Sequence, residues 1–224
     1  MNSDKRTRYL NWGKSEYGIG ILILLAIDAN FLVFNFKLHF LISKFLSDFI
    51  LLLFLIIILL NKSSWLQRLG FSRFKKEIVA EGVALLLVCY FLLYGIKVIF
   101  KILTIDLPTV HPKYLYAGNP ELLIFFSFVL IGPIVEEIYM RGFIFNGLLN
   151  EMNWMKAAVI SSSIFALVHV SPGNIYRFIP AFIFGMAFCY LFNKSRSVIP
   201  GIIIHSFHNL FIFLITYKQY LSTL

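Results

Sequence analysis

Apolar runs long enough to cross a lipid bilayer recur along the whole chain. Of its 224 residues, 59% are hydrophobic and only 14% are charged, which is more apolar surface than a soluble domain of this length can bury. A crossing helix needs about 20 apolar residues. The sequence therefore predicts an all-α fold, a polytopic transmembrane bundle forming a single domain over residues 1–224. We expect seven spans, at residues 17–36, 40–61, 78–103, 121–149, 155–171, 175–193 and 198–217.

The basic residues indicate how this bundle is oriented. The net charge is +9, and Lys and Arg cluster beside apolar runs instead of along an exposed face, which favours membrane orientation over nucleic-acid binding. They occur before the first run, in the connection 62–77, and at Lys156, Lys194 and Arg196. The positive-inside rule places these parts in the cytoplasm. We expect a multi-pass cell-membrane protein with a cytoplasmic N-terminus and no nucleic-acid partner.

Two connections between the expected spans have distinctive compositions. Segment 62–77 mixes aromatic and basic residues, so it is either an interfacial amphipathic helix or a basic connecting loop. Segment 104–120 contains three prolines and a glycine and is expected to be an irregular external loop. No soluble domain is evident in either.

Two adjacent carboxylates and an arginine interrupt the fourth apolar run. Each ionisable group at membrane depth costs at least about 2.5 kcal/mol on insertion scales, so such groups usually face a bundle interior. Glu137 and Arg141 are four positions apart and can form an ion pair on one helix face. Glu136 points about 100° away from Glu137. It therefore needs a partner from another helix.

Two later runs carry polar residues at helical spacing. Phe165 and His169 lie one turn apart in the fifth run, and His205 and Asn209 lie one turn apart in the seventh. An unsatisfied polar group in hydrocarbon costs several kcal/mol, so His205 and Asn209 need a shared polar partner. Glu136 is the candidate for that partner.

These residue types are suited to hydrolysis. A carboxylate beside a histidine can take a proton from a water molecule that attacks a carbonyl, and histidine and asparagine can donate hydrogen bonds to the resulting oxyanion. The same side chains also suit zinc. The H-E-x-x-H helix of common zinc proteases is absent, and the helical spacing leaves both mechanisms open.

Three motifs in order give the chain a family resemblance. Glu136-Glu137-x-x-x-Arg141, Phe165-x-x-x-His169 and His205-x-x-x-Asn209 each lie on a separate apolar run. Together they resemble the motifs of the CAAX protease and bacteriocin-processing (CPBP) family of intramembrane proteases, also called the Abi or type II CAAX prenyl endopeptidase family. The resemblance covers about the C-terminal half, with a protease core at about residues 121–217.

The resemblance implies an endopeptidase that works inside the membrane. By similarity, Glu136 and His169 would activate the water, and His205 and Asn209 would form the oxyanion site. The supporting residues would be Glu137, Arg141 and Phe165. The family is widely described as metalloproteases. We favour a glutamate-activated water without a cofactor and assign no metal ligand, with zinc as the alternative.

The substrate is less constrained than the reaction. The resemblance implies that the substrate is a membrane-associated protein or peptide. It would be a leader, signalling or bacteriocin-type peptide, or a prenylated C-terminus. The Lys- and Phe-rich composition favours a bacterial plasma-membrane protein. The alternative function is a noncatalytic membrane scaffold, or a bacteriocin self-immunity protein, that binds a partner through the same polar cavity. A small transporter would predict an internal repeat, which the sequence does not clearly show.

Overall fold

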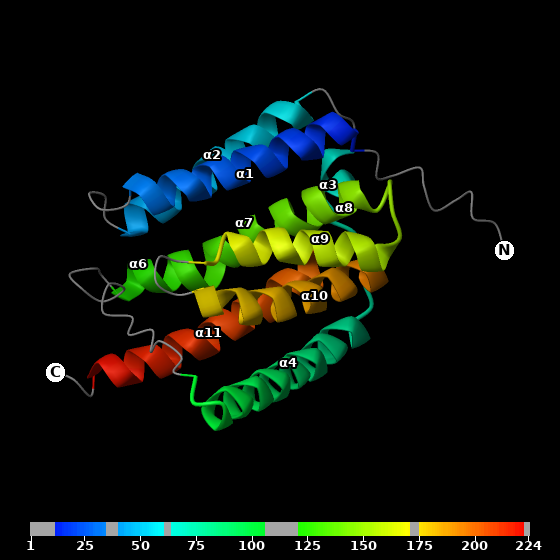
Figure 1. Ribbon diagram of the computed structural model, residues 1–224. Coiled ribbons are helices and arrows are strands. Elements are labelled where there is room, and N and C mark those ends of the chain that lie inside the picture. Colours follow the sequence, from blue (N-terminus) through cyan, green and yellow to red (C-terminus); the bar gives the residue numbers. More distant parts are fainter. Residues whose placement is uncertain (1–11, 35–39, 61–63, 106–120, 171–174, 222–224) are drawn as a thin grey trace.

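The computed structural model describes residues 12–34, 40–60, 64–105, 121–170 and 175–221, and all of their regular secondary structure is helical (Figure 1). The predicted all-α class is therefore confirmed. The helices are α1 (Lys14–Phe34), α2 (Phe40–Leu59), α3 (Trp65–Arg68), α4 (Glu77–Ile102), a composite helix over residues 121–148, α9 (Trp154–Leu167), α10 (Phe178–Ser195) and α11 (Ile199–Leu221).

Four of these helices are long and apolar enough to cross a bilayer, which supports a membrane protein. They are Glu77–Ile102, Glu121–Leu148, Ile175–Ser195 and Ile199–Gln219. In contrast, α9 has 14 residues, or about 21 Å at 1.5 Å per residue, against about 30 Å of hydrocarbon. It ends at Leu167, four residues before the predicted end of the fifth span. The count of seven spans stays a prediction.

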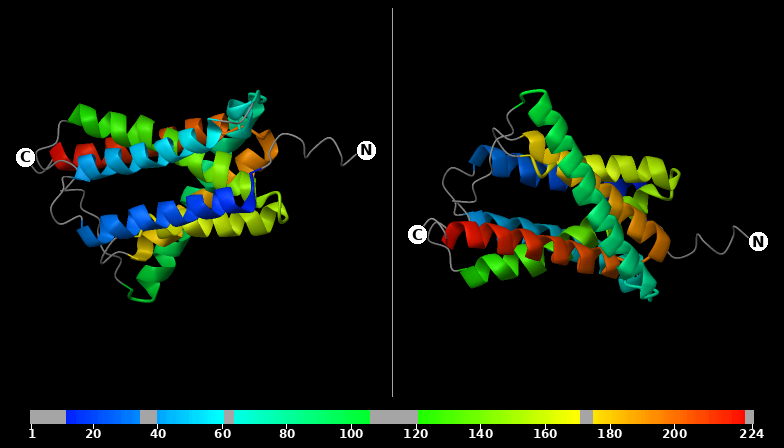
Figure 2. Two further views of the ribbon diagram at one scale, coloured as in Figure 1. Left: turned by 90° about the horizontal axis from the view of Figure 1, so that it is seen from above. Right: turned by 90° about the horizontal axis from the view of Figure 1, so that it is seen from below.

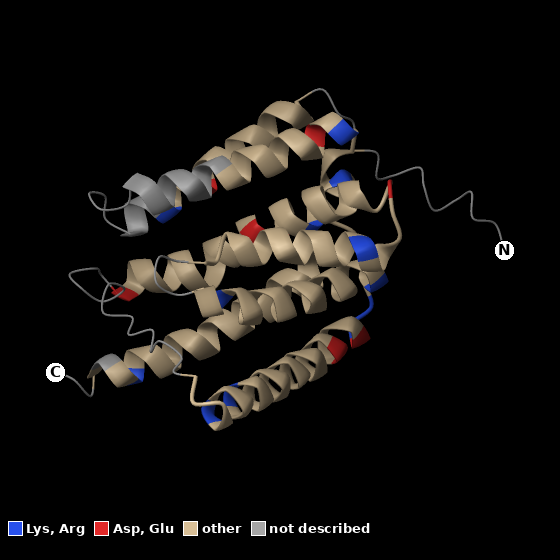
Figure 3. Cartoon of the chain, viewed as in Figure 1, with Lys and Arg blue, Asp and Glu red and all other residues tan. Residues whose placement is uncertain are grey.

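The helices form a bundle flanked on two sides. In Figure 1 the hairpin of α1 and α2 lies on one side, and α4 lies on the other. The composite helix, α9, α10 and α11 lie between them, and α4 crosses the neighbouring helices obliquely (Figure 2). Charged residues gather mainly at the helix ends and are few along the helix middles (Figure 3). The few in the middle of the bundle therefore identify the place to look for chemistry.

The composite helix alternates between α and π geometry. Its parts are α6 (Glu121–Phe125), the π-helix η2 (Phe126–Ile131), α7 (Gly132–Glu137), the π-helix η3 (Ile138–Phe145) and α8 (Asn146–Leu148). Pro133 lies in the first turn of α7, where its missing N–H interrupts the backbone ladder. The Glu136–Glu137 pair ends this short α segment between two wide turns. Such π segments are frequent at functional sites.

The connection at residues 62–77 is mostly irregular. Of the described residues 64–76, Trp65–Arg68 form a single helical turn and the others are irregular, so most of this part is a connecting loop. The reason is tertiary packing, because Leu69 is buried and its carbonyl lies so close to Gly142 that a Cβ there would strike it. Residues 61–63, and residues 106–120 of the other expected loop, lie outside the described residues.

Candidate active site

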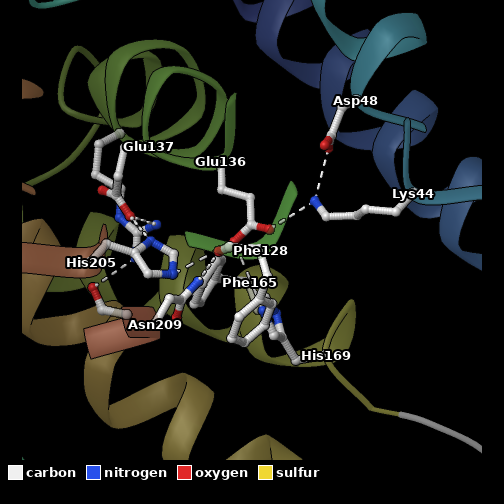
Figure 4. Close-up of polar contacts among 11 residues, drawn as sticks. Lys44, Asp48, Phe128, Glu136, Glu137, Phe165, His169, His205 and Asn209 are labelled. Carbon is white, nitrogen blue, oxygen red and sulfur yellow. Dashed lines mark hydrogen bonds and ion pairs between the residues drawn. The ribbon is translucent and has the colours of Figure 1, made fainter. Parts of the chain in front are cut away.

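The three sequence motifs meet in one polar cluster in the middle of the bundle (Figure 4). The end of α7 and the start of η3 carry the first motif, the C-terminal end of α9 carries the second, and α11 carries the third. The structure brings together all of the predicted side chains, which are Glu136, Glu137, Arg141, Phe165, His169, His205 and Asn209. Their chemical roles stay predictions.

One half of the cluster is sealed from solvent. Arg141 Nη1 donates to Glu137 Oε1 at 3.0 Å, as the four-residue spacing predicts, and the two side chains are 1% and 0% exposed. Arg141 Nη2 donates to the Gly185 carbonyl at 3.3 Å, and the guanidinium carbon lies 4.5 Å from the centroid of the Phe165 ring. Arg141 is thus held by a carboxylate, a carbonyl and an aromatic face.

The hydrogen-bond partner of His205 is Glu137, which corrects the expectation that it would be Glu136. Its Nδ1 lies 3.0 Å from Glu137 Oε1, the same oxygen that accepts from Arg141. An ionised carboxylate only accepts hydrogen bonds, so this contact assigns the hydrogen to Nδ1. The Nε2 atom then faces Glu136 Oε2 at 3.8 Å, beyond hydrogen-bond length.

Asn209 also has a different partner from the one expected. Its Nδ2 donates to the Phe128 carbonyl at 2.8 Å instead of to Glu136. Phe128 lies in η2, where a carbonyl pairs with the N–H five residues later, and that position is Pro133. Because proline has no N–H, the Phe128 carbonyl is available to Asn209. The Asn209 amide keeps a second N–H for another acceptor.

His169 lies on the open half of the cluster. It follows the end of α9 instead of lying within a helix as predicted, and its Nδ1 is 2.7 Å from the Phe165 carbonyl. A carbonyl only accepts, so Nδ1 carries the hydrogen and Nε2 is left as an acceptor in the neutral ring. That Nε2 lies 3.9 Å from Glu136 Oε2. The His169 side chain is 37% exposed and that of Glu136 is 22% exposed.

Three acceptor atoms therefore face one another. They are Glu136 Oε2 and the Nε2 atoms of His169 and His205, at 3.9 and 3.8 Å from that oxygen. Each histidine is fixed from behind through Nδ1. Such a set suits a small molecule that donates hydrogen bonds, such as water, or a cation.

Sequence reasoning missed a residue from the other side of the bundle. Lys44 Nζ, on α2, donates to Glu136 Oε1 at 3.0 Å and to Asp48 Oδ1 at 2.8 Å (Figure 4). Glu136 therefore does find its partner on another helix, and that partner is Lys44. A signal was present, because Lys44 and Asp48 are four apart in an apolar run, the same spacing that marked Glu137 and Arg141.

A further histidine of α11 lies outside the cluster. His208 Nδ1 and the Tyr90 hydroxyl are 2.7 Å apart, and the His208 ring packs on Phe184 at a centroid distance of 4.2 Å. These contacts connect α11 with α4 and α10. His208 therefore has packing partners of its own, separate from the three acceptors.

Comparisons with known proteins confirm the resemblance over part of the chain. Residues 118–211 match the family described as type II CAAX prenyl endopeptidase Rce1-like, a family of membrane proteases. This region includes all three motifs and excludes α1, α2 and α4. No solved structure matches the chain.

Bacterial relatives match a similar portion. The membrane-embedded CAAX protease MroQ of Staphylococcus aureus strain USA300 is 35% identical over 115 residues, which are 47% of this chain and 43% of that protein. The protein YdiL of Bacillus subtilis strain 168 is 31% identical over 83 residues, which are 37% of this chain and 33% of that protein. An uncharacterized protein of Mycoplasma capricolum is 32% identical over 99 residues, 44% and 27% respectively. The matched region covers less than half the length of each of these relatives.

Proposed function

We propose, on the premise that residues 118–211 belong to the Rce1-like family, that this chain is an intramembrane endopeptidase. It hydrolyses a peptide bond in a membrane-associated protein or peptide, using a water molecule activated by Glu136. The observation that carries this proposal is the convergence of Glu136 Oε2 with two histidine Nε2 atoms at 3.8 and 3.9 Å. Both histidines are held through their Nδ1 atoms, and a catalytic group needs a fixed orientation of this kind.

Glu136 acts as the general base. A water molecule donates hydrogen bonds to Glu136 Oε2 and His169 Nε2 and attacks the carbonyl carbon of the scissile bond, while Glu136 takes its proton. The tetrahedral intermediate then collapses. Glu136 returns the proton to the leaving amine nitrogen as the C–N bond breaks, so that the products are a free acid and a free amine.

Asn209 stabilises the oxyanion with the amide hydrogen that Phe128 does not use. His205 can join it only as the imidazolium, because its Nδ1 hydrogen is already donated to Glu137. Glu137 and Arg141 hold His205 in place, and Phe165 packs between Arg141 and His169.

The same residues could also be considered as zinc ligands by their chemical type. Glu136, His169 and His205 have the right donor types, and histidines fixed through the far nitrogen are usual zinc ligands. As the described residues stand, however, no three His, Cys, Asp or Glu side chains are placed to hold a metal ion. The Lys44 ammonium, 3.0 Å from Glu136 Oε1, would also repel a second cation. We therefore favour the metal-free mechanism, with zinc as the alternative, and derive no step through a metal.

The relatives and the apolar helices support a proposal for the substrate class. We propose a leader, signalling or bacteriocin-type peptide or a prenylated C-terminus, presented from the bilayer to the open half of the cluster. The rival function, a noncatalytic scaffold or self-immunity protein, would not require three fixed acceptors around one point.

Cleavage by purified protein in liposomes tests this function. The probes are a farnesylated CAAX peptide and a hydrophobic leader-type peptide, with products identified by mass spectrometry. Glu136→Gln keeps the size of the side chain but removes the basic oxygen, so we expect about 1,000-fold slower cleavage by a protein that still inserts. Glu151→Gln, a surface glutamate paired with Lys14, is the matched control and should cleave normally.

The outcomes separate the hypotheses. Cleavage that is lost in Glu136→Gln but unaffected by a chelator supports the proposal. Loss of cleavage with chelator and recovery with zinc would replace it with a metal mechanism. Well-folded wild-type protein that cleaves neither peptide would favour the scaffold.

A further inference from the structure

We propose that Lys44 is a positioning residue that holds the Glu136 carboxylate in its reactive orientation. This inference rests on the proposed function. It also extends the site, because Lys44 lies on α2, outside the region that matches the protease family.

The two oxygens of the Glu136 carboxylate have different neighbours. Oε1 accepts a hydrogen bond from Lys44 Nζ at 3.0 Å, while Oε2 faces His205 and His169. A carboxylate bonded through one oxygen cannot rotate freely about its last torsion. Lys44 thereby keeps Oε2 directed at the two histidines.

Asp48 keeps Lys44 in place. Its Oδ1 accepts from Lys44 Nζ at 2.8 Å, one helical turn away on α2, and its side chain is 5% exposed. An ammonium at membrane depth is costly without opposite charge, and Lys44 lies between two carboxylates. If Lys44 were removed, Asp48 and Glu136 would face each other without a cation between them, and Glu136 would be free to turn away.

The hairpin that carries Lys44 is fastened to the protease core at its other end as well. The Tyr139 hydroxyl donates to the Gly20 carbonyl of α1 at 2.8 Å, and Trp12 Nε1 donates to the Gly142 carbonyl at 3.2 Å. Trp12 also packs edge-on against Phe143, with centroids 4.8 Å apart. These contacts fix the hairpin while Lys44 reaches the site, so α2 contributes to catalysis as well as to packing.

The first test compares two lysine-to-methionine variants on the same hairpin. Lys44→Met removes the ammonium with little change in length, and we expect kcat to fall about 100-fold while KM stays within about twofold of wild type. Lys14→Met also breaks an ion pair between the hairpin and the core, Lys14–Glu151 at 2.8 Å, but remote from the site. It should leave both constants unchanged. Equal kcat for Lys44→Met and wild type would overturn the inference.

A chemical rescue separates the charge from the space that Lys44 fills. Lys44→Cys is treated with 2-bromoethylamine, so that the thiolate displaces bromide and gains an ammonium at nearly the lysine length. We expect kcat to recover at least tenfold. Bromoethane adds the same chain without charge and should restore nothing. Wild type treated in parallel controls for Cys89 and Cys189, which are free and buried. Equal recovery with both reagents would reduce Lys44 to a space-filling role.

A measurement without turnover distinguishes this inference from the proposed function. The midpoint of thermal unfolding is compared for wild type, Lys44→Met, Glu136→Gln and the double variant. A non-additive shift demonstrates the Lys44–Glu136 contact even if no peptide is cleaved, in which case only the proposed function fails. Additive shifts would overturn the inference even in an active protease.

Discussion

The two halves of the polar cluster differ in their access to solvent and in what they are built to do. Glu137, Arg141 and His205 have side chains 0%, 1% and 6% exposed, and Glu137 Oε1 accepts from both of the other two. Glu136 and His169 are 22% and 37% exposed, and their acceptor atoms Oε2 and Nε2 face each other at 3.9 Å without a direct hydrogen bond. Adjacent glutamates in one helix thus serve different ends. Glu137 is the buried acceptor of both Arg141 and His205, whereas Glu136 is partly exposed and paired with Lys44.

The same substitution at the two glutamates should give the largest contrast. Glu137→Gln leaves Arg141 buried beside a neutral amide, and we expect the free energy of unfolding to drop by about 3–5 kcal/mol. Glu136→Gln leaves Lys44 paired with Asp48 and should cost only about 1 kcal/mol. Unfolding by SDS in mixed micelles, followed by tryptophan fluorescence, measures both. Equal losses of stability in the two variants would contradict the different roles assigned to the two glutamates.

Asn209, which lies one helical turn from His205 and is bonded to the Phe128 carbonyl, should show the next largest effect. Asn209→Ala should slow cleavage about 100- to 1,000-fold if its amide stabilises the oxyanion. It also leaves the Phe128 carbonyl unpaired, at a cost of about 1–3 kcal/mol of stability.

Pro133→Ala provides the companion variant. It supplies an N–H at the position that η2 leaves without one, so adding it to Asn209→Ala should recover stability but not cleavage. Parallel peptide-cleavage and SDS-unfolding measurements on the single and double variants decide this. Recovery of cleavage in the double variant would show that Asn209 acts only through the backbone.

A substitution at Gly201 tests the buried half of the cluster. A methyl group there would lie 3.0 Å from Glu137 Oε2, so Gly201→Ala requires α11 or Glu137 to shift by a few tenths of an ångström. Since His205 is one turn along the same helix, the shift would reach the site. We expect a loss of about 1–3 kcal/mol in stability and a smaller loss in kcat. Gly95→Ala on α4, where nothing lies within 4 Å, is the control.

Tyr90 should have the smallest effect and none on chemistry. Tyr90→Phe removes the hydroxyl that contacts His208 Nδ1, which should lower the free energy of unfolding by about 1 kcal/mol. Cleavage should stay at the wild-type rate, because His208 faces α4 and α10. A slowed reaction in an otherwise stable Tyr90→Phe protein would extend the site to His208.

The sequence predicts the parts of this site that depend on local spacing. The all-α class follows from the apolar runs, and the Glu137–Arg141 pair follows from their separation within one helix. The partners of His205 and Asn209 depend on how the helices pack and on the π geometry of η2. The spacing of residues in the sequence predicts neither. Glu136 was therefore assigned as their partner incorrectly.

The sequence also did not predict where α9 ends or that Lys44 contacts Glu136. The end of α9 was predicted too late, because Val168 and His169 are as apolar or aromatic as the helix before them. In the structure, the N–H groups of His169 and Val170 bond carbonyls three residues earlier instead of four. Lys44 had a readable spacing to Asp48, but nothing in either apolar run linked it to Glu136, 92 positions away.

The π segments on either side of α7 should determine where the composite helix tolerates a change in length. A single-residue deletion within Phe126–Ile131 can be absorbed as that π segment tightens to an α turn, and both glutamates keep their directions. A deletion among residues 132–135 would rotate both glutamates by about 100° relative to the residues before them, so that Glu137 would take the position of Glu136. Insertions and deletions among homologues should therefore collect in the π segments and avoid the six residues between them.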